Sequence, residues 1–348
     1  MSKRLIYEDD TQPGITRRHH GRGFAYFDAR GRRLKSQAEE QRIRRLAIPP
    51  AWTNVWISAR AKAHLQATGR DARGRKQYKY HPDFRAHREE EKFARILEFA
   101  RALPTIRRTV QRHMSLKGLP RQKVLATIVW LLEKTLIRIG NADYARQNHS
   151  YGLTTLHDPH VNVRGSELRF HFKGKSGKIW RLQITNRRVA KIVKACQDLP
   201  GQHLFQYGDS DGVIREVSSS DVNAYLRDIT DKDITAKDFR TWAGTVLAAL
   251  ALTELSSADN ELAAKRNIRA AINAVASQLG NTPTICRKCY VHPVILESYL
   301  ADELVSTLKQ RTHEKLAKMN RLKPEEAAVL ALLQAHLNKR AKKSRSAK

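Results

Sequence analysis

The sequence predicts an α+β fold, in which a small β-rich N-terminal domain precedes a larger, mainly helical domain. Short aromatic or β-branched runs bounded by turn residues occupy residues 1–88. Apolar stripes with helical spacing dominate residues 89–338, interrupted by one strand meander at about residues 161–185. The last segment, 339–348, is a run of Lys, Arg and Ser, which predicts a disordered basic tail.

The charge balance points to a polyanionic partner. The 348 residues include 65 Lys+Arg against 34 Asp+Glu, a formal net charge of +31. Such an excess repels itself unless a polyanion compensates it, and nucleic acid does so with release of counterions. The sequence has no apolar run of membrane-spanning length and no signal-peptide pattern. Three cysteines argue against a disulfide framework, so we expect a soluble, cytoplasmic nucleic-acid-binding protein without a membrane partner.

A basic, tyrosine-bearing stretch, "GRDARGRKQYKYHPDFR", ends the β-rich segment. Tyr78 and Tyr80 lie two residues apart, so on a strand they share one face. One interpretation is a ribbon that lies on DNA, where cationic groups reach phosphates or guanine edges. The other is a solvated hairpin with its tyrosines packed inward. The candidate DNA-binding residues here are Arg70, Arg73, Arg75, Lys76, Tyr78 and Tyr80.

The second domain alternates helices with the meander. "RQKVLATIVWLLEKTLIRIG" predicts a helix entered after Pro120 and ended at Gly140. "TAKDFRTWAGTVLAALAL" starts with capping-box spacing, and a later helix ends at Gly280 as a C′ glycine. Thr282 and Pro283 begin a short helix that carries Tyr290 near its end. "SELRFHF" and "KIWRLQIT" alternate as strands around the turn "GKSG".

Four stretches resemble one family, the type IB DNA topoisomerases in their bacterial and poxvirus-like form. In order along the chain they are "LIRIGNADY", "HFKGKSGK", "KDFRTW" and "LGNTPTICRKCY". The resemblance implies catalytic roles for Arg138, Lys175, Arg240 and Tyr290, with double-stranded DNA closed in a clamp between the two domains. With the basic N-terminal segment it covers nearly the whole chain, and it implies a cytoplasmic, nucleoid-associated monomer.

The residue types fit that chemistry. Attack by a tyrosine oxygen on a phosphodiester places extra charge on the non-bridging oxygens, which rigid arginine forks neutralise. Lys175, at a hairpin tip, can give a proton to the leaving 5′ oxygen, as an arginine cannot. The phosphotyrosine keeps the energy of the broken bond, so religation needs no ATP. The sequence has no G-x-x-x-x-G-K-[ST] loop and no carboxylate cluster with metal-ligand spacing, so we expect no cofactor and no metal.

Asn281 departs from the family pattern, since many relatives have histidine nine residues before the tyrosine. An amide can donate a hydrogen bond to a phosphate oxygen but cannot carry charge, so it is expected to stabilise the transition state as a neutral donor. The alternative is that Asn281 only helps to end a helix beside Gly280.

Other assignments stay open. Lys173 and Lys178 are rivals of Lys175 for the role of proton donor; only the resemblance favours Lys175, and whether either neighbour assists it stays open. Tyr144 either contacts a phosphate as a DNA-binding residue or packs in the core. The Cys286 and Cys289 pair invites a zinc or redox interpretation, but small buried hydrophobes are the commoner role.

Two other functions account for part of the pattern. A site-specific tyrosine recombinase uses a similar residue set, but typically has histidine where Lys237 stands here. A non-enzymatic architectural DNA-binding protein explains the charge but not the ordered set of arginine, lysine, arginine and tyrosine. The sequence therefore favours a topoisomerase that relaxes supercoiled DNA through a 3′-phosphotyrosine intermediate.

Overall fold

A computed structural model describes residues 5–209, 211–255, 258–308 and 322–346, without the side chains of 86, 89, 90, 92, 93 and 340–346. The chain divides into two compact units, Met1–Ala94 and Arg95–Lys348. Helix α2 (Pro82–Met114) runs through this division. The division follows residue 94, six residues beyond the boundary that the sequence predicts after residue 88. The α+β class is confirmed, because antiparallel sheets and helices occur together.

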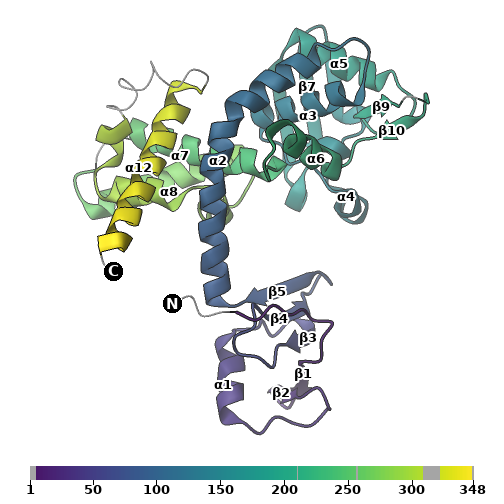
Figure 1. Ribbon diagram of the computed structural model, residues 1–348. Helices are drawn as coiled ribbons and strands as arrows, with labels where there is room; N and C mark the ends of the chain where they lie inside the picture. The colour runs from purple at the N-terminus through teal and green to yellow at the C-terminus, as the bar shows by residue number, and fades with distance from the viewer. Residues whose placement is uncertain (1–4, 210, 256–257, 309–321, 347–348) are drawn as a thin grey trace. The chain divides into compact units, whose positions relative to one another are not determined.

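The first unit is built on one antiparallel sheet (Figure 1). Its five strands follow the order β2-β1-β3-β4-β5, which makes β5 an edge strand. Helix α1 (Gln37–Arg45) supplies Ile43, which is buried with Ile15, Val55 and Ile57 in a small core. The strands are β1 (Ile15–His20), β2 (Gly23–Phe27), β3 (Thr53–Ile57), β4 (Leu65–Arg70) and β5 (Lys76–Tyr80).

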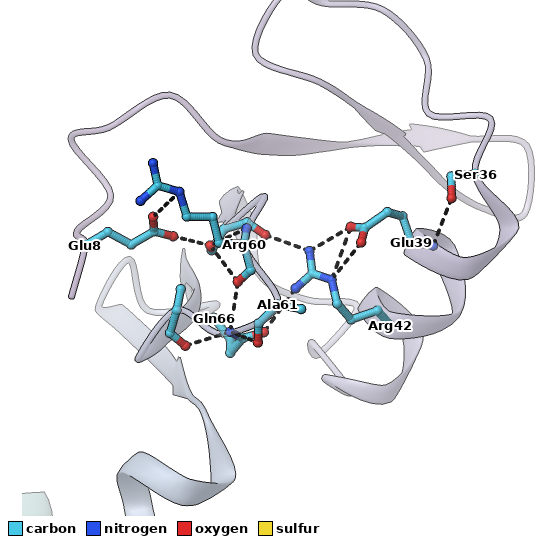
Figure 2. Close-up of polar contacts among 9 residues, drawn as sticks. Glu8, Ser36, Glu39, Arg42, Arg60, Ala61 and Gln66 are labelled. Atoms are coloured by element: carbon cyan, nitrogen blue, oxygen red, sulfur yellow. Dashed lines mark hydrogen bonds and ion pairs between the residues drawn. The ribbon is translucent and has the colours of Figure 1, made fainter. Parts of the chain in front are cut away.

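Polar contacts hold α1 to this sheet (Figure 2). Arg42 donates to the Glu39 carboxylate at 2.9 Å, to the Ser58 carbonyl at 2.7 Å and to Gln66 Oε1 at 3.0 Å. Buried Glu8 accepts a hydrogen bond from the Ser58 hydroxyl, so the segment before β1 is tied to the same region. These bonds satisfy groups that would otherwise be costly to bury, and they stiffen a unit whose apolar core is small.

The second unit packs helices on helices around a large apolar core. Helix α3 (Arg121–Thr135) is largely buried and contacts α6 and α7, while α7 packs on α8, α10 and α12. Arg107 of α2 donates to Glu326 of α12 at 2.7 Å and to Glu133 of α3 at 3.0 Å, which fastens three helices together. The other helices of eight or more residues whose bounds lie within the described ranges are α5 (Arg187–Gln197), α6 (Ser219–Thr230), α7 (Ala236–Glu254), α8 (Glu261–Leu279), α10 (Pro293–Leu300) and α12 (Pro324–Ser346).

The expected meander is a three-stranded antiparallel sheet, β6 (Val161–Arg164), β7 (Glu167–Lys173) and β8 (Ile179–Thr185). Leu168, Phe170 and Phe172 point into the core, as their alternation predicts. Phe172 pairs with Trp180 across the β7–β8 hairpin, whose tip is the 3₁₀ turn η3 (Lys175–Gly177). The described residues of this unit also contain a two-stranded ribbon, β9 (Gln206–Gly208) with β10 (Ile214–Glu216).

Two expectations about helix ends need correction. Helix α3 ends at Thr135 rather than Gly140, because Leu136 takes a left-handed conformation with φ 56° and caps the helix. The residues after it, with Arg138, form a loop that η1 (Leu153–Thr155) supports, where Leu153 N donates to Arg138 O at 2.9 Å. Helix α12 continues to Ser346, so most of the segment expected as a disordered tail is helical, as its Ala, Lys and Arg content permits.

Candidate active site

Tyr290 stands at the C-terminal end of the short helix α9 (Pro283–Cys289), as the sequence predicts. Its backbone N–H donates to Cys286 O at 2.9 Å. Its backbone also lies against α7, where a Cβ added at Gly244 would come 2.6 Å from Tyr290 O. Thr245, which follows Gly244 on α7, places its hydroxyl oxygen 3.4 Å from Tyr290 O. The same hydroxyl oxygen accepts a hydrogen bond from His292 N at 3.1 Å. Helix α7 therefore fixes the backbone on the C-terminal side of the tyrosine, while its amide is held within α9.

Arg240 comes from the same helix, one turn before Gly244, and is only 3% exposed. Its guanidinium donates to Leu279 O at 2.6 Å and to Leu136 O. The guanidinium carbon lies 5.1 Å from the centre of the Tyr290 ring. The structure thus brings Arg240 and Tyr290 together, although fifty residues separate them in the chain.

Arg138 reaches the same place from the loop after α3. It donates to Gly280 O at 3.2 Å and to Oδ1 of Asn281. The loop is held by close backbone contact, because a Cβ at Gly152 would lie 2.5 Å from Arg138 O. The residues that the sequence assigned to catalysis from three separate stretches therefore meet at the C-terminal end of α8.

Both arginines are held by main-chain carbonyls at helix C-termini. Leu136 closes α3, and Leu279 and Gly280 close α8. The last carbonyls of a helix have no partner within it, and they carry the negative end of the helix dipole. No carboxylate within 4.0 Å pairs with either arginine among the described residues, so both charges stay available to an anion.

Burial makes this charge costly. Desolvation, and then the positive charge of Arg138, lower the pKa of Arg240 to about 10. That value leaves the group protonated at neutral pH. An anion bound beside the two arginines would offset their mutual repulsion, so the site is arranged to favour a negatively charged ligand.

The side-chain amide of Asn281 has a donor nitrogen, Nδ2, that no described residue pairs with. Its Oδ1 must be the atom that faces Arg138, because a guanidinium has only donors. The orientation of the amide is therefore fixed, and Nδ2 is buried without a hydrogen-bond partner in the described part of the chain. A buried unsatisfied amide costs about 1–3 kcal/mol, which suggests a ligand atom as its partner. Gly280, with φ 63°, is the left-handed residue that ends α8, so helix termination does not depend on Asn281.

Lys175 lies on the exposed turn between β7 and β8, followed by Ser176 at φ 62°. Its Nζ is 5.7 Å from the ring centre of Tyr144, which is half-buried on α4 (Ala142–Asn148). Lys178 is engaged elsewhere, since its Nζ donates to Ser277 O at 3.2 Å. Lys173 is exposed at the end of β7, so of the three lysines only Lys175 lies at the tip beside Tyr144.

The candidate DNA-binding residues of the first unit lie along the exposed β4–β5 hairpin. Tyr78 and Tyr80 are 47% and 38% exposed, and their rings stack at 6.0 Å on one face, so they do not pack inward. Four basic side chains are exposed beside them: Arg70, Arg73, Arg75 and Lys76. Arg75 and Lys76 pair with Asp71 and Asp10 at 2.7 and 2.6 Å, so part of this charge is compensated locally.

The cysteine pair before Tyr290 shows no metal site. Cys286 is buried and Cys289 half-buried, and both are free thiols. Burial raises the pKa of the Cys286 thiol to about 11. The described residues contain no cluster of three or more His, Cys, Asp or Glu suited to a metal ion. In the same residues no helix is long and apolar enough to cross a membrane.

Sequence reasoning missed several residues that shape the site. Gly244 stands inside a segment rich in helix-forming residues, and a glycine in a helix interior often signals a close approach of another backbone segment. Leu136 gave no signal, because leucine rarely adopts positive φ. Trp180 was recognised only as a strand residue, although it contacts Gly280.

Comparison with known families identifies the class of protein. Residues 81–320 match the family model described as the eukaryotic DNA topoisomerase I catalytic core. Residues 23–71 match the bacterial DNA topoisomerase IB N-terminal domain. The chain is therefore an enzyme of the topoisomerase class, and neither the recombinase nor the architectural alternative is supported.

Two individual relatives indicate which type of DNA topoisomerase the chain resembles. The chain is similar to DNA topoisomerase 1B of Acanthamoeba polyphaga mimivirus, 33% identical over 299 residues that cover 84% of this chain and 89% of the relative. It is also similar to DNA topoisomerase 1B of vaccinia virus (strain Copenhagen), 22% identical over 284 residues that cover 78% and 86%. The chain belongs to the type IB DNA topoisomerases, as its four motifs suggested.

Proposed function

We propose that the protein relaxes supercoiled duplex DNA by cutting one strand transiently, allowing rotation and rejoining the strand without ATP. The observation that carries the proposal is the convergence of Arg138, Arg240 and Asn281 at the end of α8, with Arg240 against the Tyr290 ring and no compensating carboxylate among the described residues. Such an arrangement suits a phosphodiester whose negative charge grows during the reaction.

We propose that cleavage transfers the phosphate from the 5′ oxygen to Tyr290. The Tyr290 hydroxyl gives its proton to water and its Oη attacks phosphorus, so that a tyrosine–phosphate bond forms as the bond to the 5′ oxygen breaks. The 5′ oxygen takes a proton from Lys175, while Arg138, Arg240 and the Asn281 amide bind the non-bridging oxygens. Religation reverses each step. Because the bond energy is kept in the phosphotyrosine, no nucleotide is consumed.

DNA contact in the first unit is proposed for the exposed hairpin with Tyr78 and Tyr80 and its basic neighbours. The net charge of +31 favours contacts to phosphates, which position the duplex without reading its sequence. In the second unit, Tyr144 beside Lys175 is proposed as a further phosphate contact. One chain carries all five proposed catalytic residues, so we propose that the enzyme acts as a monomer on the DNA of the cytoplasmic nucleoid.

Relaxation of a plasmid that carries no special site tests the proposal. The reaction is run with negatively and with positively supercoiled plasmid, in EDTA and without ATP. We expect complete relaxation of both, and a covalent protein–DNA adduct when the reaction is stopped with detergent. An absolute requirement for magnesium or ATP would overturn the proposed mechanism. Activity confined to one DNA sequence, with strand exchange, would instead indicate a recombinase.

A further inference from the structure

Trp180 joins the lysine hairpin to the end of helix α8. A Cβ placed on Gly174, in the hairpin turn, would lie 2.7 Å from Cδ1 and Nε1 of the indole. A Cβ placed on Gly280 would lie 2.8 Å from Cζ2 at the other side of the indole. Both positions admit only glycine while the ring stays where it is. The indole therefore fills the space between the turn that carries Lys175 and the backbone that precedes Asn281.

Two hydrogen bonds support the same docking. Lys178 Nζ donates to Ser277 O in the last turn of α8 at 3.2 Å. On the β7 side, Lys173 O accepts a hydrogen bond at 2.8 Å from Tyr151 N, two residues before η1. The hairpin is thus fixed on both sides of its tip, while Lys175 itself is exposed.

We infer that Trp180 is a positioning residue for Lys175, which sets the distance between the proton donor and the pocket of Arg138 and Asn281. The inference rests on the proposed role of Lys175 as general acid. A long lysine side chain on a turn delivers a proton only if its backbone is placed well. Misplacement of about 1 Å can cost ~10²-fold in rate. The stacking of Trp180 parallel to Phe172, with ring centres 6.2 Å apart, holds the indole from the core side.

A change of leaving group separates positioning of the acid from general damage. The test uses a DNA strand in which sulfur replaces the bridging 5′ oxygen at one cleavage site. A thiol has a reference pKa of about 8.5, so it departs as thiolate without needing the lysine proton. Single-turnover cleavage of the oxygen and sulfur strands is compared for the natural protein and for the variants Lys175→Ala, Trp180→Ala and Trp180→Phe. Trp130→Ala is the matched control, because Trp130 is also partly buried against the core but lies on α3.

We expect Trp180→Ala to cleave the oxygen strand about 10²-fold more slowly and to retain most of its rate on the sulfur strand. Lys175→Ala should show the same selective loss, and Trp180→Phe should recover much of the oxygen rate. Equal losses by Trp180→Ala on both strands, or no loss on either, would overturn the inference while leaving the general acid in place. Failure of sulfur to rescue Lys175→Ala would instead refute the acid role and, with it, the inference. The Trp130→Ala protein should show no selective loss of cleavage rate on the oxygen strand relative to the sulfur strand.

Discussion

Replacing Asn281 with alanine removes the buried Nδ2 that lacks a partner and the Oδ1 that accepts from Arg138. If Nδ2 donates to a phosphate oxygen in the transition state, the loss should resemble that of one oxyanion donor elsewhere. Such losses slow chemistry by ~10²–10³-fold, which corresponds to about 2.7–4 kcal/mol. Duplex binding should change little, because both arginines remain.

The stability of the free protein should respond differently. The substitution relieves a buried unsatisfied amide, worth about 1–3 kcal/mol, and removes a hydrogen bond to a charged group, worth about 1.5–3 kcal/mol. These effects oppose each other, so Tm should move little. Arg138 keeps its bond to Gly280 O, which limits its displacement. A large kinetic defect without a stability defect is therefore the signature of a catalytic donor.

The assay follows formation of the covalent adduct by rapid quench at several pH values, on a DNA substrate that traps the nicked product. Thermal unfolding of each variant is measured in parallel. Asn281→His should restore much of the rate, because an imidazole N–H can donate in place of the amide. It should also introduce a pH dependence near the histidine reference value of ~6.5. An alanine variant that cleaves at the natural rate would refute the reasoning, and the partner of the phosphate oxygen would then lie elsewhere.

Further outcomes are expected. Tyr290→Phe should abolish adduct formation while DNA affinity, measured by filter binding, stays near that of the natural protein; adduct formation by this variant would exclude Tyr290 as nucleophile. Gly244→Ala should reduce stability by about 1–3 kcal/mol and slow cleavage, because its Cβ would lie 2.6 Å from Tyr290 O. Gly208→Ala, which meets nothing within 4 Å, is its control, and equal effects would contradict the close-approach argument. Burial lowers the pKa of His157 and of His160, so the folded protein favours their neutral forms. The stability that these neutral histidines contribute should therefore be fully present above the pKa of about 6.5 in the unfolded chain, and it should be lost as the pH falls toward their lower pKa values in the folded protein. His160→Asn should flatten this loss in a plot of Tm against pH; an unchanged slope would refute the reasoning.

Much of the fold could be predicted from local signals. The capping box of Thr235 and Asp238 is present, with Thr235 N donating to Asp238 at 2.8 Å, and Gly280 ends α8 with the expected positive φ. The alternation of Leu168, Phe170 and Phe172 placed β7 correctly. These features depend on a few neighbouring residues, which a sequence displays directly.

The end of α3 could not be predicted in this way. Leu136 adopts a left-handed conformation that leucine disfavours, and its carbonyl accepts from Arg240, 104 positions later in the chain. The backbone conformation is thus stabilised by a contact that no local pattern reveals. The same holds for the burial of Arg240, which the sequence shows only as one basic residue beside an apolar stripe.

The identities of the proposed catalytic residues came from motif resemblance, while their geometry came from the structure. The sequence suggested that Asn281 was either a donor or a helix terminator. The donor role stays a proposal, which two features support: Gly280 already ends the helix, and the amide nitrogen is buried without a partner among the described residues. Trp180 was missed because a contact between a hairpin and a distant helix end leaves no periodic trace.

The use of backbone carbonyls to hold the two arginines has a consequence for mutational tolerance. Every amino acid supplies a carbonyl, so replacing the side chain at Leu136 or Leu279 leaves the acceptors of Arg240 in place as long as the helix ends persist. A carboxylate clamp would be lost by a single substitution, and it would neutralise charge that is available here to an anionic ligand. This pocket can therefore keep its electrostatic character while the surrounding sequence drifts, with the arginines themselves and the glycines at the close contacts as its fixed points.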